Sequence, residues 1–365
     1  MRELVEELCS LERGSASEGE RAAAALLRGR FAAAGADSAD LQGFRYSPRW
    51  TDAHAAHYAA GLVAARAGGT LPARALAVAA GVSLALEFSG RRQWVRKLLP
   101  RAEGANAIAR VRPRRERRRT IVVMAHIDAA QTGLMWHPAF TGMWAAQARR
   151  TGKAGSPGTL PLVALAAIAA GGRRARLAGG ALLATSLALA ADVASKGSVP
   201  GANDNACAAA GLVTLVDRFA RDPLEHTELI AVATGCEESG MGGAAAFIRG
   251  AGAELDPATT LVVGLDQIGA GDPHVLTGEG PPGLASYRQA DLRCAGDTPR
   301  FHAAAWTDPI VAVFAGLPAI SIVGVKDGGF PNYHLPSDTP DKVDWDSVER
   351  CLALAGRIAT EFDAA

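Results

Sequence analysis

The chain has 365 residues, of which 49% are hydrophobic and 21% are charged, and its formal net charge is +1. A chain of this length and composition can bury a large core, which excludes extensive disorder. The near-zero net charge gives no global electrostatic reason to expect a nucleic-acid partner. The five cysteines are scattered without paired spacing, which argues against a disulfide framework and favours a reducing compartment.

The N-terminal region predicts two helices and a short strand. Apolar residues recur at helical spacing over 4–11, and Ser15 or Ser17 can cap a second helix over 21–34. A strand is predicted at 41–46. The N-terminus is charged rather than apolar, so we expect no secretion signal.

An apolar block follows and leads into two predicted strands. Residues 55–88 are rich in Ala, Leu, Val and Gly, and a basic segment occupies 91–101. Alternating patterns predict strands at 106–111 and 120–126, joined by an arginine-rich turn at 112–119. No aromatic residues are interleaved with these arginines, so we interpret the turn as a solvated hairpin tip rather than a nucleic-acid patch.

A second apolar block precedes an ordinary α/β pattern. The stretches 154–172 and 177–191 carry no charge. Beyond residue 199 the sequence predicts helices at about 205–220, 242–249, 309–315 and 347–362, and strands at 228–234, 260–266 and 319–323. Strands that alternate with helices predict an α/β fold, with a mostly parallel mixed sheet flanked by helices.

Five stretches place metal-ligand residue types at or near the ends of predicted strands, where open α/β sheets build their sites. They are VVMAHID, PGANDNA, ATGCEESGMGG, LVVGLDQIG and GGFPNYHLPSDTPDKVD, which carry His126 and Asp128, Asp204, Glu237 and Glu238, Asp266, and His334. Each stretch alone also has a purely structural interpretation, such as a helix N-cap at Asp204. Together they supply two histidines and three carboxylates as ligands, plus a spare glutamate. This set suits two zinc ions bridged by one carboxylate, with the remaining Glu as general base.

The order of these motifs, with TDPIVAVFAGLPAISI before the last one, resembles the dizinc aminopeptidases of metallopeptidase family twenty-eight. That family also contains glutamate carboxypeptidase, transferrin receptor and glutaminyl cyclase relatives. The resemblance implies a zinc-exopeptidase fold of the phosphorylase/hydrolase-like type. It also implies a catalytic domain made of residues 1–50, 101–135 and 197–365.

The resemblance assigns a role to each candidate residue. It implies two Zn²⁺ per chain bridged by Asp204, with His126 and Asp266 completing one metal site and Glu238 and His334 the other. Glu237 becomes the general base, Asp128 orients the His126 imidazole, and the Asp204–Asn205 peptide bond is a candidate for the cis form.

The implied activity is that of an aminopeptidase acting on peptides with a free N-terminus. Zinc lowers the pKa of bound water and polarises the scissile carbonyl, while Glu237 takes the water's proton and returns it to the leaving amine. Two departures from the family leave substrate choice open. The interval between His126 and Asp204 is much longer than in soluble members, and residues 278–299 look shortened and loop-like.

The blocks at 51–100 and 136–196 each predict an inserted apolar helical hairpin. They resemble a subset of the family with paired transmembrane helices at these positions, which implies a membrane anchor. The alternative is a soluble lid over the active site, because Arg66, Arg74 and Glu87 interrupt the first pair. Basic residues are more numerous on the catalytic side of the blocks than at the hairpin tips. The positive-inside rule then predicts a cytoplasmic catalytic domain, and a lid would make the whole chain cytoplasmic.

Two other functions stay open. One is a glutaminyl cyclase-like acyltransferase with a single zinc, against which the complete ligand set argues. The other is a non-catalytic, receptor-like module, against which the intact Glu237 argues. The number of bound metals discriminates among the three. The preferred N-terminal residue, the physiological substrate and the oligomeric state are left open.

Overall fold

A nine-stranded mixed sheet forms the centre of the protein in the computed structural model, which describes residues 1–365. The strands are β1 (Ser38–Tyr46), β2 (Ala102–Val111), β3 (Arg119–His126), β4 (Thr227–Thr234), β5 (Thr260–Asp266), β6 (Asp272–Glu279), β7 (Ala285–Ser286), β8 (Arg300–Ala303) and β9 (Ala319–Val325). Their order is β1-β2-β4-β3-β5-β9-β6-β7, and β8 pairs with β6. The central strands β4, β3, β5 and β9 run parallel, and antiparallel pairs flank them on both sides. The predicted mixed α/β sheet is therefore confirmed.

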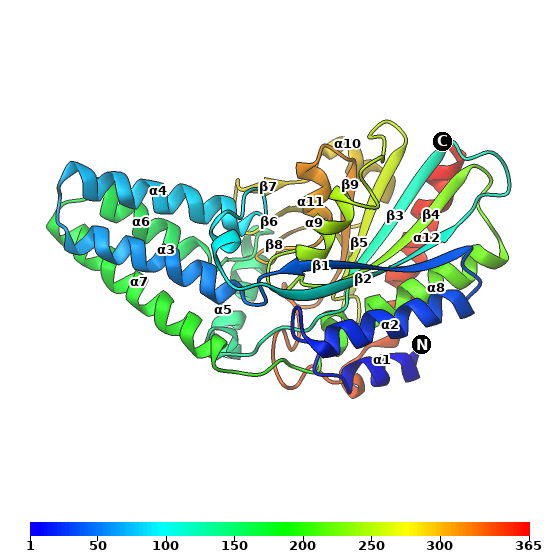
Figure 1. Ribbon diagram of the computed structural model, residues 1–365, viewed down its shortest axis with the longest axis horizontal. Helices are drawn as coiled ribbons and strands as arrows, with labels where there is room; N and C mark the ends of the chain where they lie inside the picture. Colours follow the sequence, from blue (N-terminus) through cyan, green and yellow to red (C-terminus); the bar gives the residue numbers. More distant parts are fainter.

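Helices cover both faces of the parallel strands, which explains why these strands are continuously apolar. One face carries α1 (Arg2–Cys9), α2 (Glu18–Ala33), α8 (Cys207–Arg221) and α12 (Trp345–Ala364). The other carries α9 (Gly242–Arg249) and α11 (Pro309–Phe314), as Figure 1 shows. Every residue of β4 and β5 is buried. Ser17 caps α2 by accepting the backbone N–H of Glu20 at 3.1 Å, one of the two caps the sequence predicts.

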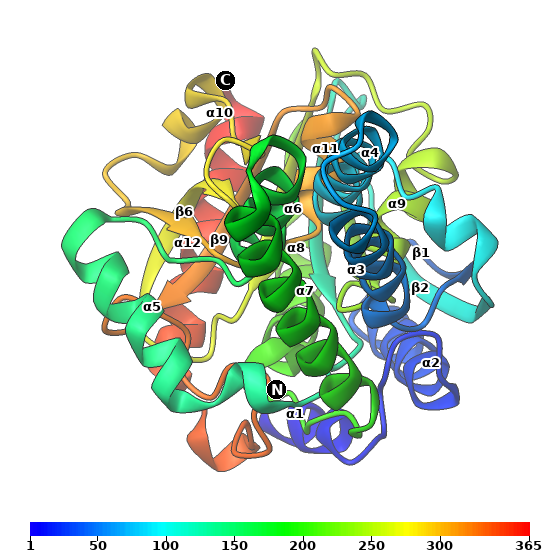
Figure 2. The same ribbon diagram turned by 90° about the vertical axis from the view of Figure 1, so that its left-hand side faces the viewer.

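Four helices form a separate helical bundle that projects from one end of the sheet (Figure 1). They are α3 (Trp50–Arg66), α4 (Leu71–Phe88), α6 (Thr159–Ala170) and α7 (Arg173–Ala194), and Figure 2 views them end-on. Ten buried side chains form a core of their own, distinct from the main core. Close packing favours glycine at position 61, because a Cβ there would lie 2.4 Å from Leu183 Cδ1 and the leucine would have to move. The two apolar helical hairpins expected from the sequence are thus present.

The second insertion also holds a helix that the hairpin expectation lacked. Helix α5 (Pro138–Thr151) begins after a cap at His137, whose Nδ1 accepts the N–H of Ala139 at 3.2 Å, and it ends at the left-handed Gly152. Its residue Ala148 belongs to the main core rather than to the bundle core. Helix α5 therefore lies against the α/β body, beside the bundle (Figure 2).

The hairpin interpretation of the arginine-rich turn is wrong, because β4 lies between β2 and β3 in the sheet. The arginine-rich turn instead crosses over β4. Its arginines pair with acidic residues just before and at the start of β4. Arg115 pairs with Glu225 at 3.0 Å, and Arg117 pairs with Glu228 at 2.9 Å. The charges of these arginines are therefore partly neutralised within the chain.

The segment between β6 and β9 holds β7, the single-turn helix α10 (Gln289–Leu292), β8 and α11. Residues 278–299, for which the sequence predicts a shortened, loop-like region, contribute β7 and α10 to it. Buried residues of this segment, such as Tyr287 and Phe301, join the main core.

Candidate metal centre

The candidate residues gather at the C-terminal ends of adjacent parallel strands. His126 ends β3, Asp266 ends β5, and Glu237 and Glu238 follow β4 within four residues. Because β4, β3 and β5 are neighbours and run parallel, their ends meet at one edge of the sheet. Asp204, between β3 and β4 in sequence, precedes α8 at the same edge.

Asp204 lies between two imidazoles. Its Oδ1 is 3.1 Å from His126 Nε2, and its Oδ2 is 3.2 Å from His334 Nε2. Asp266 Oδ1 is 3.6 Å from His126 Nε2, the histidine nitrogen that faces Asp204 Oδ1. Glu238 Oε2 is 3.3 Å from His334 Nε2, the histidine nitrogen that faces Asp204 Oδ2. Each carboxylate oxygen of Asp204 thus faces a different histidine–carboxylate pair.

The donor set fits metal cations. Ligand atoms of His126, Asp204 and Glu238 all lie within 4.8 Å of one another, and their residues are at least partly buried. Glu238 Oε1 and Asp266 Oδ1 are buried without a hydrogen-bond donor. Burying several carboxylates together is costly unless cations compensate their charge. Histidine nitrogens and carboxylate oxygens together are the ligands of zinc rather than of calcium or magnesium.

Burial and mutual repulsion shift the ionisation of the glutamates. Burial, aided by the carboxylate of Glu238, raises the pKa of Glu237 well above its ordinary value. Burial, aided by Asp204, does the same to the pKa of Glu238. For Asp204, burial is outweighed by the hydrogen bonds and charges of His126 and His334, so its pKa is lowered. Bound cations among these groups would favour the ionised carboxylates.

The Asp128 carboxylate holds the Glu237–Glu238 turn. Its Oδ1 accepts the backbone N–H of Glu237 at 3.0 Å, and its Oδ2 accepts that of Glu238 at 3.1 Å and the hydroxyl of Ser15 at 2.6 Å. His126 Nδ1 lies 3.0 Å from the main-chain oxygen of Asp128 and 3.7 Å from its carboxylate. The main chain of Asp128, more than its carboxylate, therefore orients the imidazole.

Asp338 positions the bridging candidate and was given no role in the sequence analysis. Its carboxylate accepts the backbone N–H groups of Asn203 at 2.9 Å and Asp204 at 3.0 Å. The Asp204–Asn205 peptide bond is cis, as the resemblance implied. The signal available for Asp338 was its place in the SDTPD stretch after His334.

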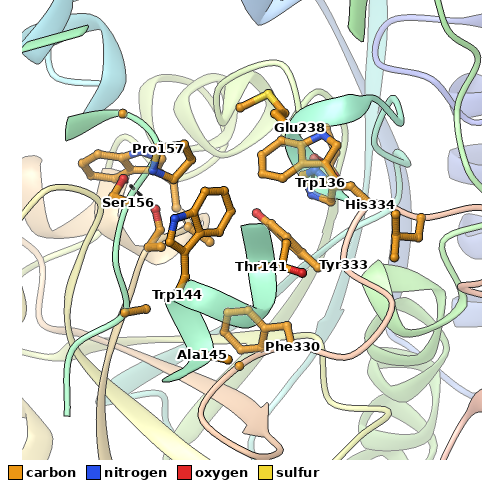
Figure 3. A pocket seen from close by; sticks show the side chains of 18 of the residues that line it. Trp136, Thr141, Trp144, Ala145, Ser156, Pro157, Glu238, Phe330, Tyr333 and His334 are labelled. Carbon is orange, nitrogen blue, oxygen red and sulfur yellow. Dashed lines mark hydrogen bonds and ion pairs between the residues drawn. The ribbon is translucent and has the colours of Figure 1, made fainter. Parts of the chain in front are cut away.

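A large cavity opens beside this cluster, and the inserted segments supply much of its wall. This aromatic cavity has a volume of about 640 Å³ and is lined by both Glu237 and Glu238. Figure 3 shows Trp136 beside Glu238 and His334, with Trp144 and Phe330 further around the wall. The Tyr333 ring lies against the His334 ring, with 3.8 Å between centroids. The Trp136 ring meets the His334 ring edge-on, with 4.4 Å between centroids. No motif in the sequence indicates a role for either tryptophan.

Solved structures with the same fold include several peptidases. An aminopeptidase from Aneurinibacillus sp. strain AM-1 aligns with a TM-score of 0.58 at 14% identity, covering 99% of this chain and 92% of that one. BSAP, a zinc aminopeptidase from Bacillus subtilis, gives 0.54 at 13% identity, with 99% and 94% covered. A Bacteroides thetaiotaomicron glutaminyl cyclase bound to N-acetylhistamine gives 0.54 at 13% identity, with 98% and 96% covered.

These likenesses establish the fold. No curated protein sequence matches the chain. The family model of Peptidase family M28 matches residues 175–359, which is half of the chain and includes Asp204, Glu238 and His334. The chain therefore belongs to peptidase family M28.

Proposed function

We propose that this protein is a zinc aminopeptidase with two zinc ions per chain, bridged by Asp204. One observation carries the proposal: the two carboxylate oxygens of Asp204 face two different histidines, at 3.1 and 3.2 Å. A carboxylate placed in this way can give one oxygen to each of two metals. The zinc aminopeptidase from Bacillus subtilis, which has the same fold, supports the choice of metal.

The proposed ligands divide into two sets that share Asp204. His126 and Asp266 would complete one set, and Glu238 and His334 the other. Bound zinc lowers the pKa of a coordinated water to about 7 and polarises a carbonyl oxygen.

Glu237 is the proposed general base. Its carboxylate is buried, with Oε2 4.0 Å from His126 Nε2, and it lines the aromatic cavity. Asp128 accepts the backbone N–H of Glu237, which positions the main chain of this residue. Glu237 would take a proton from the attacking water and return it to the leaving amine. The carboxylates around it would attract an α-ammonium group and confine cleavage to the first peptide bond.

A glutaminyl cyclase-like acyltransferase is the second candidate. Its support from the fold is about equal to that of the aminopeptidase. The cyclase from Bacteroides thetaiotaomicron aligns as well as the Bacillus subtilis aminopeptidase does. The complete pair of ligand sets around Asp204 favours the aminopeptidase.

The test is the zinc content of protein purified without chelator, followed by hydrolysis of amino-acid anilides. We expect two zinc ions per chain and anilide hydrolysis. Glu237→Ala should keep both zinc ions and lose activity, whereas His334→Ala should lose one zinc. One zinc, with cyclisation of N-terminal glutamine, would establish the cyclase instead. If the protein contains no zinc after purification under conditions that preserve bound zinc, a non-catalytic module is the remaining interpretation.

We further propose that the helical bundle enters a lipid bilayer. Helices α4 and α7 are long and apolar enough to cross one, and only 28% and 22% of their apolar windows are buried inside the protein. A core helix of a soluble protein would be mostly buried. Large apolar side chains stand exposed on the bundle: Val63, Leu71, Leu76, Val78, Val82, Leu160, Val163, Leu177 and Leu182. Helix α6, with 12 residues, is shorter than the roughly 20 residues that a span needs.

Flotation of the full chain with phospholipid vesicles tests this proposal. We expect the protein to float with the vesicles, and Val82→Glu on α4 to weaken this association by removing apolar contact. Leu41→Glu on β1 is the matched control, because Leu41 is comparably exposed but lies on the catalytic body. Protein that stays in the aqueous fraction, with or without Val82→Glu, would identify the bundle as a soluble lid.

A further inference from the structure

A second, smaller cavity adjoins the candidate metal centre. It has a volume of about 230 Å³ and shares Trp50, Glu238 and His334 with the aromatic cavity. Only three of its 14 lining residues are hydrophobic. Its other walls come from the loop before α2, the segment before α3 and the segment after α7. We call it the polar cavity.

Two cations line the polar cavity. Arg49 uses Nε for Asp52, at 3.2 Å, and its two terminal nitrogens have no partner in the protein. Lys196 Nζ lies 3.9 Å from Asp192 Oδ1, which is too far for a hydrogen bond. Both side chains are about half exposed and keep most of their donors available. The anion in the lining is Glu238, which is already a proposed zinc ligand.

The two cavities differ in the substrate groups they suit. Cations at Arg49 and Lys196 repel an α-ammonium and attract a carboxylate. The aromatic cavity is lined by Trp136, Trp144 and Glu237, and it suits an apolar N-terminal residue whose ammonium Glu237 attracts. Its lining also holds Arg96, Arg149 and Lys326, of which Arg96 is paired with Glu87 and Arg149 donates to the main-chain oxygen of Asp327. A peptide lying across the metal centre would therefore direct its N-terminal residue into the aromatic cavity and its chain into the polar one.

The polar cavity is the smaller of the two, with about 230 Å³ against about 640 Å³ for the aromatic cavity, so it suits a short remainder of peptide such as a single residue. A residue that ends there in a free carboxylate would be attracted by the two cations.

We propose that the polar cavity binds the C-terminal carboxylate of a dipeptide through Arg49 and Lys196. The preferred substrates are then dipeptides with an apolar first residue, rather than the N-termini of long chains. This inference rests on the aminopeptidase function proposed above and names the substrate class of that site.

The test compares Phe-Leu with its C-terminal amide, which differs only in the negative charge. We expect the zinc-loaded wild-type protein to cleave Phe-Leu with a kcat/KM roughly tenfold higher than that of Phe-Leu-amide, the range of a charge-assisted hydrogen bond. Arg49→Gln combined with Lys196→Gln should lower kcat/KM for Phe-Leu roughly tenfold and leave Phe-Leu-amide unchanged. High salt should reduce the preference.

Arg45→Gln is the matched control. Arg45 is an exposed cation on β1 that lines neither cavity, so its loss should leave both rates unchanged. Equal cleavage of acid and amide by the wild type would overturn the carboxylate site and leave the aminopeptidase standing. An equal loss for both peptides in the double variant would do the same. If neither peptide nor any anilide is cleaved, the aminopeptidase function fails, and the dipeptide proposal fails with it.

Discussion

The Asp128 carboxylate accepts the backbone N–H of Glu237 at 3.0 Å, which ties the end of β3 to the turn after β4. Its second oxygen accepts the N–H of Glu238 at 3.1 Å. One buried carboxylate thus fixes both the proposed base and a proposed zinc ligand. The geometry of the centre depends on Asp128 through these two hydrogen bonds.

Asp128→Asn should lower kcat/KM by about 10- to 100-fold, the usual effect of losing a group that orients metal ligands. An amide can accept one of the two N–H groups but presents its own donor to the other. Ser15→Ala is the control, because it removes the third donor to the same carboxylate, at 2.6 Å, without touching the turn. Steady-state kinetics on an anilide substrate measure both variants. A loss in Ser15→Ala as large as that in Asp128→Asn would contradict this account.

A buried ion pair connects the helical bundle to the same turn. Arg96 pairs with Glu87, the penultimate residue of α4, and donates to the main-chain oxygen of Ser239. Nearby, Tyr46 Oη donates to the main-chain oxygen of Gly240 at 2.7 Å, and Gln93 Nε2 donates to the same atom at 3.0 Å. The first insertion is therefore bonded to the residues directly after Glu238.

Arg96→Met should destabilise the protein by about 3 kcal/mol, because it leaves the Glu87 carboxylate buried without its partner. It should also lower kcat by freeing the turn after Glu238. Denaturant unfolding and kinetics on the same samples measure the two effects. Arg92→Met, at an exposed position on the same segment, should change neither. If Arg96→Met has the same free energy of unfolding as the wild type, the ion pair contributes nothing to stability.

Glu279 is fully buried in a network away from the metal centre. Its Oε1 accepts hydroxyl groups from Tyr287 and Thr307, both at 2.5 Å, and its Oε2 accepts the Thr307 N–H at 2.8 Å. Burial, only partly offset by these hydrogen bonds, raises the pKa of Glu279 from 4.5 to about 8. Between these pH values the folded chain binds more protons than the unfolded chain. The contribution of Glu279 to the free energy of unfolding therefore falls as pH rises.

Glu279→Gln should remove this pH dependence, because the amide stays neutral. Its nitrogen can donate to the Tyr287 and Thr307 hydroxyl oxygens, so the variant should be within about 1 kcal/mol of wild type at pH 5. At pH 8.5 the variant should be more stable relative to wild type than at pH 5. Urea unfolding of both proteins at the two pH values provides the measurement. A stability difference that stays constant between pH 5 and pH 8.5 would show that Glu279 is already ionised.

Zinc removal should lower the thermal stability as well as the activity. A ligand that binds only the folded state stabilises it by about 2.7 kcal/mol when its free concentration is 100 times its dissociation constant. Chelation should therefore lower the melting temperature by several degrees, and added zinc should restore it. His126→Ala should show a smaller shift than the wild type on chelation, because it removes a ligand from only one of the two sets. An unchanged melting temperature of the wild type after chelation would contradict the proposed site.

The sequence predicted the centre of the sheet because its signals there are local. Strands such as β5 are continuously apolar and end in a single carboxylate, Asp266. The pairing of β2 could not be predicted in the same way. Its neighbour β4 lies more than 100 residues further along the chain, and nothing in the arginine-rich turn indicates that β4 comes between β2 and β3.

The proposed ligands could be picked out because each belongs to a short motif. The residues that hold them could not, because their partners are distant in sequence. Asp338 acts on the N–H of Asp204, and Arg96 acts on the oxygen of Ser239. Composition identified the insertions as apolar. It did not show that α5 and Trp136 lie outside the bundle and line the aromatic cavity.

Trp136 is the residue through which the second insertion contacts the metal centre. Its indole Nε1 is buried without an acceptor, and its ring packs edge-on against His334. An unsatisfied donor in the wall of a substrate cavity costs free energy until a ligand accepts a hydrogen bond from it. Trp136→Phe keeps the ring contact and removes the donor. It should raise KM about fivefold, the effect of one neutral hydrogen bond, with kcat and zinc content unchanged. Trp136→Ala removes both and should also weaken zinc binding, measured by chelator competition. An unchanged KM in Trp136→Phe would leave the indole N–H without a role in binding and would assign Trp136 to the support of His334 alone.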